Sequence, residues 1–256
     1  MRRTIDDRHR YPGAVAVFAG LALMLCGALA PAATPEKQEL KLGFIKLTDC
    51  APLVVAYEKG FFEDEGLYVT LEAQANWKVV IDRVIDGSLD ASHMLPGQAL
   101  GAAVGFGGQA ELVGVAVLGV NTLAVTLGNE VWKTLKPTLA MDGDHPLHPI
   151  TANKLKPVIE SIGAGGRQFT MAMVFPTSTH NYLLRYWLAA GGIHPGYYTA
   201  GDNTGTSDGE VNLSVTPPPQ MPATLGAGTI FGYSVGEPWN QQAVMKGIGV
   251  PVVTAA

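Results

Sequence analysis

Three positions in the sequence place a ligand-binding group where a chain turn would expose it. Trp77 lies between a predicted strand and a predicted helix, and its indole N–H is a donor without acceptor capacity. His180 lies in the polar turn 177–181 at the start of another predicted helix, where a neutral imidazole N–H can donate to an anion with help from the helix dipole. Gly236 follows a predicted strand and lets the backbone approach a ligand closely. Such donors suit a planar oxyanion.

Each of these residues also has an ordinary structural interpretation. Trp77 could pack at an element boundary, and His180 could be a solvated loop histidine. Glu237, beside Gly236, cannot donate to an oxyanion unless it is protonated. It therefore either caps the following helix or binds a cation, and we favour the cap.

The segment Lys41–Leu67 predicts how one wall of such a site is built. Leu40–Leu47 is rich in β-formers and predicts a buried strand. The polar turn 48–50 follows, and Pro52 then suits the first turn of a helix. A strand that feeds a helix in this way places free backbone N–H groups, with Thr48 among them, at the carboxyl end of a sheet. Asp49 is more consistent with a helix cap than with an anion ligand.

Alternation of strands and helices continues along the chain and predicts an α/β fold with mainly parallel sheets. A polar stretch at 141–149 predicts a surface excursion. The predicted strands are Leu67–Ala73, Leu89–Met94, Leu112–Val120 (buried), Gln168–Phe175 and Val211–Val215, and the predicted helices are Val79–Ile85, Pro96–Val104 and Asn181–Ala190.

The amino terminus indicates export. Four arginines precede the uncharged apolar run Ala14–Ala30, and small residues follow it, which predicts a cleavable signal peptide at residues 1–32 and a periplasmic location. Its removal changes the formal net charge from −5 to −7, which disfavours nucleic acid as a partner. Only Cys50 then remains, so no internal disulfide is possible.

Several segments together resemble the periplasmic nitrate- and bicarbonate-binding proteins of bacterial ABC transporters. They occur in the family's order, and they are GFIKLTDCAPLVVAYEKGFFEDEGL, Trp77 after QAN, FPTSTHNYLLRYWLAAGGI, PPPQM, and VGEPWN followed by QQAVMKGIG. The resemblance implies a two-lobe type II periplasmic-binding-protein fold, with the ligand between the lobes. We expect lobe 1 at 33–120, lacking its C-terminal return, and a complete or nearly complete lobe 2 with the hinge region at 121–256.

The resemblance also implies which residues bind the ligand. Trp77, His180 and Gly236 match positions that line the family's pocket. Asn121 and Thr122 occupy the segment where nitrate binders place a glutamine, and Thr48 belongs to the first turn. We expect no catalytic residue, no metal ligand and no cofactor.

The implied function is the solute-binding component of an importer. It would capture nitrate or nitrite and deliver it to an inner-membrane ABC permease. Bicarbonate is the alternative ligand, and its proton would need an acceptor, for which Glu237 is the obvious candidate. A nitrate-sensing regulator remains a less favoured alternative, and so does an enzyme that uses Cys50 as a nucleophile. The run DGDHPLHP (142–149) resembles a metal cluster, yet it has the composition of an exposed turn.

Overall fold

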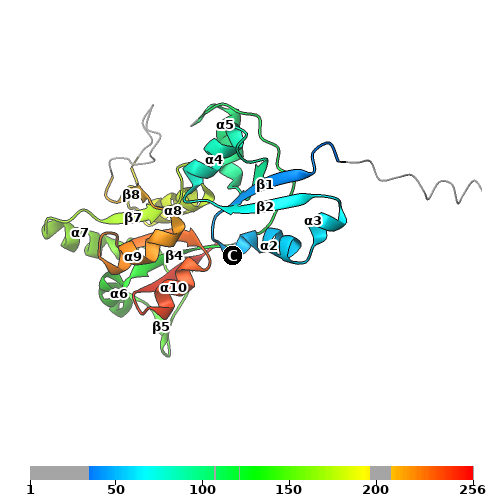
Figure 1. Cartoon of the computed structure of the whole chain (residues 1–256). Coiled ribbons are helices and arrows are strands. Elements are labelled where there is room, and N and C mark those ends of the chain that lie inside the picture. The colour runs from blue at the N-terminus through cyan, green and yellow to red at the C-terminus, as the bar shows by residue number, and fades with distance from the viewer. Residues whose placement is uncertain (1–34, 107, 121, 197–208, 256) are drawn as a thin grey trace, which may run out of the picture. The chain divides into compact units, whose positions relative to one another are not determined.

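Two main β-sheets organise the chain in the computed structural model, which describes residues 35–106, 108–120, 122–196 and 209–255. The smaller sheet has three strands in the order β2-β1-β3, and the larger has five in the order β10-β4-β9-β7-β8. Both lie within the unit Lys37–Ala256, which Figure 1 shows in colour.

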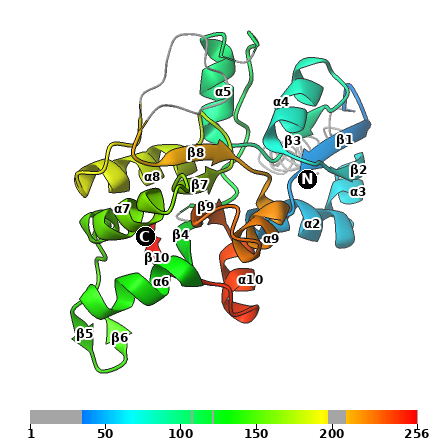
Figure 2. The same cartoon turned by 90° about the vertical axis from the view of Figure 1, so that its left-hand side faces the viewer.

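The smaller sheet is parallel throughout. Its central strand β1 (Glu39–Phe44) pairs along its whole length with β2 (Tyr68–Ala73) and at two residues with β3 (Ala91–Ser92). Parallel neighbours need crossover connections, and helices supply them here. In Figures 1 and 2, α2 and α3 lie on one side of β1 and β2, and α4 lies on the other. The helices of this region are α2 (Ala51–Glu58), α3 (Phe61–Asp64), α4 (Trp77–Ile85) and α5 (Pro96–Ala103), with the short 3-10 helix η2 (Thr48–Cys50) before α2.

Local sequence explains where these helices begin and end. Pro52 lies in the first turn of α2, where its missing N–H leaves no bond unmade. Gly60 ends the turn after α2 with φ 75°, a conformation that costs glycine little. Asn76 caps α4, because its side-chain oxygen accepts a hydrogen bond from Val79 N at 3.0 Å.

The larger sheet is mixed. β7 is parallel to both β8 and β9, whereas β4 is antiparallel to β9 and to β10. Its strands are β4 (Leu123–Gly128), β7 (Thr170–Met173), β8 (Asn212–Val215), β9 (Gly232–Gly236) and β10 (Gly249–Thr254). The helices of this region are α6 (Asn129–Leu135), α7 (Lys156–Ala164), α8 (Thr179–Ala190), α9 (Met221–Gly226) and α10 (Trp239–Met245), with 3-10 helices η3 (Lys136–Thr138), η4 (Ala152–Leu155) and η5 (Pro218–Gln220).

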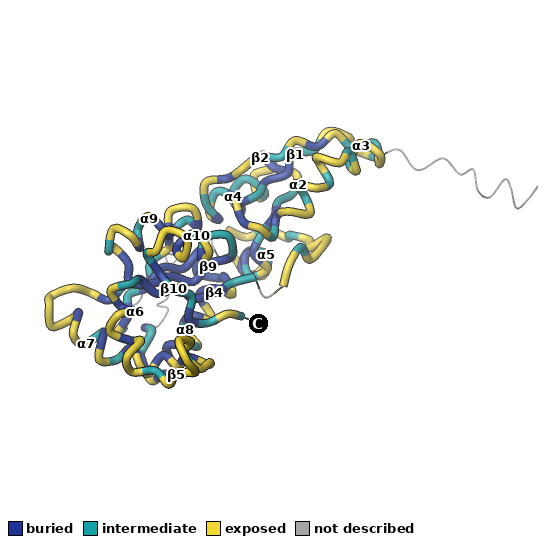
Figure 3. The backbone as a smooth tube through the Cα atoms, turned by 90° about the horizontal axis from the view of Figure 1, so that it is seen from below, coloured by how far each residue is buried: buried dark blue, intermediate teal, exposed yellow. Residues whose placement is uncertain are grey.

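The alternation of β7 shows that both faces of this sheet are covered. Met171 and Met173 belong to the apolar cluster that also contains Leu184 and Leu188 of α8. Ala172 and its neighbour Val174 instead join the cluster with residues of α9 and α10. Successive strand residues point to opposite faces, so α8 and α10 cover different faces. Figure 2 shows α7 and α8 on one side of β4, β7 and β9, with α9 and α10 on the other, and Figure 3 shows β4 and β9 largely buried.

Most of the predicted elements are present with shifted ends, but one prediction is wrong. The stretch Leu112–Val120 was expected to be a buried strand. It forms no strand, and four of its valines (Val113, Val115, Val117, Val120) are 75–89% exposed. The alternation of apolar residues favours a strand, but no neighbouring strand covers this segment in the described chain.

The polar stretch at 141–149 is a surface feature, as predicted. It contains the two-stranded hairpin of β5 (Met141–Asp142) and β6 (His145–Pro146), whose residues are mostly exposed. The strands β4 and β10 and the helices α6 and α7 were not predicted from the sequence.

The α/β class and the wholly parallel smaller sheet agree with the sequence prediction, whereas the larger sheet is mixed. No helix of the described residues is both long enough and apolar enough to span a membrane. The predicted signal peptide at residues 1–32 lies outside the described residues, and the lobe boundaries at 33–120 and 121–256 stay predictions.

Gly97 offers a test of the packing between α5 and the loop before α8. A Cβ at Gly97 would overlap the carbonyl oxygen of Thr177. We therefore expect Gly97→Ala to lower the free energy of unfolding by more than about 2 kcal/mol, because backbone would have to move. Chemical denaturation of the purified protein measures it.

Gly163→Ala is the matched control. Gly163 lies in α7, and a Cβ there would meet no atom within 4 Å. The substitution should raise the free energy of unfolding by about 0.5–1 kcal/mol, since alanine favours a helix over glycine. Equal effects at the two positions would contradict this packing.

Candidate functional site

Seven buried side-chain atoms have no hydrogen-bond partner in the described part of the chain. A buried polar atom without a partner is rare in a folded protein and calls for an explanation, such as a bound ligand. These atoms are Asp49 Oδ1, Trp77 Nε1, His93 Nδ1, Thr177 Oγ1, His180 Nδ1, His180 Nε2 and Ser234 Oγ.

Trp77 is held as the first residue of α4. Its backbone oxygen accepts a hydrogen bond of 2.7 Å from the buried Gln98 side chain of α5, and its side chain is 1% exposed. The indole ring meets the His93 ring edge-on, with centroids 5.4 Å apart and 67° between the planes. The helices α4 and α5 therefore hold the indole N–H where it meets no acceptor of the described residues.

His180 lies in the first turn of α8. Ser178 caps this helix by accepting a hydrogen bond from Asn181 N at 3.1 Å, which fixes the backbone around His180. Burial lowers the pKa of His180 from 6.5 to about 4, and the negative charge of Asp49 opposes part of this shift. At neutral pH the ring is therefore uncharged, with one nitrogen a donor and the other an acceptor.

His93 and Asp49 lie in contact beside Trp77. His93 follows β3 and Asp49 lies in η2, just after β1, so the pairing of these two parallel strands brings them together. His93 Nε2 lies 3.1 Å from Asp49 Oδ1, but the two atoms are not aligned for a hydrogen bond. The other nitrogen, Nδ1, faces no partner.

Gly236 and Gly101 lie close to two residues of this set, His180 and Thr177. A Cβ at Gly236 would lie 3.4 Å from Thr122 O and 4.0 Å from His180 Nε2, so Gly236 borders His180. Ser234 lies two residues earlier on the same strand and thus on the same face of the sheet. A Cβ at Gly101 of α5 would lie 3.6 Å from Thr177 Oγ1, so α5 borders the Thr177 hydroxyl.

The site residues come from both sheets and follow the carboxyl ends of parallel strands. Asp49, Trp77 and His93 follow β1, β2 and β3, whereas Thr177 and His180 follow β7. Ligands of open α/β sheets commonly bind at this edge. Hydrogen bonds join the two regions here, because Thr48 N donates to Glu237 O at 2.8 Å and the Trp239 side chain donates through Nε1 to Lys46 O at 2.9 Å.

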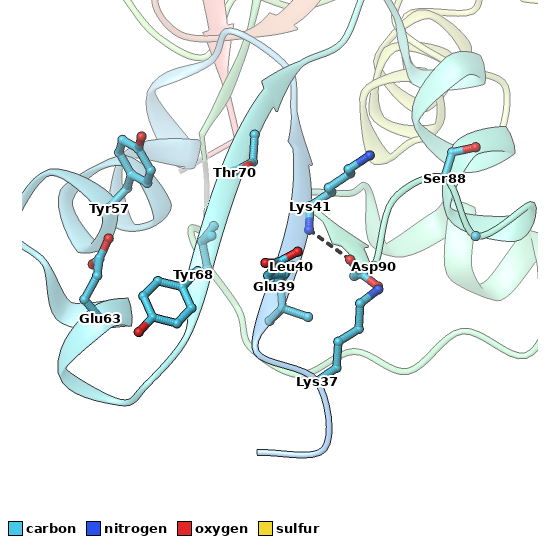
Figure 4. Close-up of a pocket in the computed structure, with 12 residues that line it drawn as sticks. Lys37, Glu39, Leu40, Lys41, Tyr57, Glu63, Tyr68, Thr70, Ser88 and Asp90 are labelled. Carbon is cyan, nitrogen blue, oxygen red and sulfur yellow. Dashed lines mark hydrogen bonds and ion pairs between the residues drawn. The ribbon is translucent and has the colours of Figure 1, made fainter. Parts of the chain in front are cut away.

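A separate hollow of about 650 Å³ lies at the opposite edge of the smaller sheet (Figure 4). It is lined by residues at the amino ends of β1 and β2 and by the turn before β3. Lys37 pairs there with Asp90, which also accepts a hydrogen bond of 2.9 Å from Lys41 N. The unpartnered buried atoms lie at the carboxyl edge, and we therefore place the candidate site there.

The predicted site residues fall into three groups. Trp77, His180 and Gly236 lie in or beside the buried polar set, and Thr122 lies next to Gly236. Thr48 is engaged with the protein, since its hydroxyl donates to Glu237 O at 3.3 Å. Asn121 lies outside the described residues. Their roles in binding stay predictions.

Two predictions about acidic residues have different outcomes. Glu237 caps α10, as favoured from the sequence, because its Oε2 accepts from Gln241 N at 3.0 Å. Asp49 does not cap α2, because no side chain caps that helix. The interpretation of Asp49 as a cap is therefore wrong, and the side chain turns to His93 instead.

Sequence reasoning missed four members of the set: Asp49, His93, Thr177 and Ser234. The sequence holds one signal for Asp49 and His93. Asp49 follows one predicted strand and His93 lies at the end of another, and the two strands, β1 and β3, are neighbours in the parallel sheet. No group of three or more metal-binding side chains occurs among the described residues.

Solved structures identify the fold as that of type II periplasmic-binding proteins. The chain is similar to the periplasmic nitrate-binding protein NrtA from Synechocystis, with a TM-score of 0.70 and 33% identity over 86% of this chain and 52% of that chain. A ligand-binding component of an ABC-type import system from Staphylococcus aureus has a TM-score of 0.62 at 18% identity, covering 86% of this chain and 61% of that chain, which supports the fold alone.

The chain belongs to the NMT1-like family, whose model matches residues 33–256. It is 39% identical to the nitrate import ATP-binding protein NrtC of Synechocystis, over 86% of this chain and 29% of that relative. It is 34% identical to the nitrate/nitrite binding protein NrtA of Nostoc, over 84% of this chain and 44% of the relative. The chain thus spans less than half the length of these relatives.

The buried neutral His180 predicts a loss of stability in acid. Below pH 6.5 the unfolded chain binds a proton at this residue, whereas the folded chain binds it only near pH 4. The free energy of unfolding should therefore fall by about 2 kcal/mol between about pH 7 and pH 5 through this group alone. Urea unfolding at the two pH values measures the change.

The variant His180→Gln isolates the effect. Between about pH 7 and pH 5, its free energy of unfolding should fall by about 2 kcal/mol less than that of the wild type, because glutamine takes up no proton. An identical pH dependence in the wild type and the variant would show that His180 is not held neutral by burial.

Proposed function

We propose that this protein is the periplasmic solute-binding component of an ABC-type importer and that it captures nitrate or nitrite for an inner-membrane permease. The observation that carries the proposal is the set of buried, unpartnered polar atoms from both sheets, with Trp77 and His180 as its best-placed donors. The names of the relatives and the signal peptide predicted at residues 1–32 support the anion and the compartment.

The chemistry of the site suits a small oxyanion. Trp77 Nε1–H can only donate, neutral His180 offers one N–H, and the hydroxyls of Thr177 and Ser234 can turn to donate. Fixed donors in a buried site bind a charged oxygen at about 1.5–3 kcal/mol per hydrogen bond. Specificity then arises from the placement of donors around the anion.

Bicarbonate is the second candidate, and one atom favours it. Asp49 Oδ1 is a buried acceptor without a hydrogen bond, and bicarbonate has an O–H to donate whereas nitrate has none. Glu237, the acceptor considered from the sequence, already caps α10. A bicarbonate-binding protein, CmpA of Synechococcus elongatus, is 29% identical to this chain over 84% of this chain and 44% of that relative.

The environment of Cys50 argues against an enzyme with a cysteine nucleophile. Burial raises the pKa of the Cys50 thiol, and the negative charge of Asp49 raises it further, although backbone hydrogen bonds oppose these effects. An activated nucleophile needs the opposite shift, toward a thiolate at neutral pH. We therefore propose a binding protein without a catalytic residue.

Removing the indole donor tests the placement of the ligand. Trp77→Phe keeps an aromatic ring but deletes Nε1–H, so we expect nitrate affinity to fall by about 1–3 kcal/mol, the usual cost of losing a bond to a charged partner. Isothermal titration calorimetry against nitrate, nitrite and bicarbonate measures the loss.

Trp187→Phe is the matched control, because Trp187 Nε1 donates to Ile150 O at 2.9 Å in the larger sheet's region. It should leave the affinity unchanged. If folded wild-type protein binds none of the three anions, the proposed function is wrong. Equal affinity in the wild type and Trp77→Phe would instead show that the ligand lies elsewhere.

A further inference from the structure

The pair formed by Asp49 and His93 raises a charge problem within the proposed site. Asp49 Oδ1 is buried and carries no hydrogen bond, and it lies among the donors that would surround the ligand. A carboxylate close to a bound anion repels it, and burial strengthens the repulsion because little water screens the charges. An anion site that contains this carboxylate needs a compensating positive charge.

His93 is placed to carry that charge. Its Nε2 lies 3.1 Å from Asp49 Oδ1, its Nδ1 is buried without a partner, and its ring meets the Trp77 ring edge-on. A protonated imidazole has two N–H donors. One would face the carboxylate and the other would be available to the ligand.

Among the residues that the structure describes, the other ionisable groups near Asp49 do not provide this charge. Burial keeps His180 neutral by lowering its pKa to about 4, despite the opposing influence of Asp49. Burial and Asp49 raise the pKa of Cys50, so its thiol stays uncharged. Glu237, on the turn before α10, is acidic and accepts a hydrogen bond from Gln241 N.

We propose that His93 binds the anion directly through Nδ1–H as an imidazolium paired with Asp49, so that the protein takes up one proton together with nitrate. The proton comes from the solvent and occupies the imidazole, and no bond in the anion forms or breaks. The inference rests on the proposed anion-binding function and adds a ligand residue and a pH dependence to it.

Proton counting by calorimetry tests the inference. Nitrate is titrated into the folded protein in buffers of different ionisation enthalpy between about pH 6 and pH 9, a range that starts near the ordinary histidine pKa. We expect the uptake to approach one proton at the upper end. Over that part of the range, nitrate affinity should fall about tenfold per pH unit, because binding and protonation are linked.

Variants assign the proton to its residue. His93→Gln should abolish the uptake and weaken nitrate binding at least about tenfold, with little remaining pH dependence. His180→Gln should weaken binding yet keep the uptake, because burial holds the pKa of His180 at about 4, well below the pH range titrated. His145→Gln, on the exposed β6, should change neither quantity.

Histidine-selective nitrogen NMR of the wild type gives an answer that depends on no variant. The nitrate-loaded protein should show one histidine with both ring nitrogens protonated. Nitrate binding without proton uptake, or uptake that disappears in His180→Gln but persists in His93→Gln, overturns the inference and leaves the proposed function intact. Failure of the folded wild type to bind any anion overturns both.

Discussion

The cost of burying polar groups without partners is the constraint that explains this structure. Each such group costs about 1–3 kcal/mol, and seven of them together approach the whole free energy of unfolding of an ordinary domain, about 5–15 kcal/mol. The other buried side-chain polar atoms of the described residues have partners, as Asn240 shows by accepting a hydrogen bond from the Thr126 hydroxyl and donating one to Val235 O. The exceptions belong to both sheets, and most of them follow the carboxyl ends of parallel strands, although Ser234 lies within β9. A ligand that accepts hydrogen bonds offsets this cost, so binding and folding depend on the same atoms.

The parallel pairing of β1 with β2 and β3 brings part of this set together. Residues that follow β1 and β3 meet because the strands are neighbours and run the same way, which places Asp49 against His93. Trp77 and His180 lie in the first turns of α4 and α8. The caps Asn76 and Ser178 fix the backbone of these two turns. The protein therefore positions these donors on capped helices.

The sequence predicted the local features well and the long-range ones less well. The helix starts near Trp77 and His180 and the cap by Glu237 depend on a few adjacent residues, and they are found as predicted. The stretch Leu112–Val120 has a strand pattern, but whether it forms a buried strand depends on a distant neighbour. Asp49 and His93 are 44 positions apart and each has an ordinary local interpretation. The two residues meet only because β1 pairs with β3, and no local sequence pattern specifies that pairing.

The carboxylate of Asp49 also limits how the site can distinguish between anions. A pocket of donors alone would suit nitrate, which only accepts hydrogen bonds. Asp49 Oδ1 forms no hydrogen bond and lies 3.1 Å from His93 Nε2, so in the proposed site a proton must lie between that oxygen and the anion, either on His93 or on the ligand itself. Nitrate requires the first arrangement, whereas bicarbonate can use the second because it brings its own O–H. The choice between the two ligands thus becomes a question of where one proton lies, and the pair Asp49 and His93 makes that choice depend on pH.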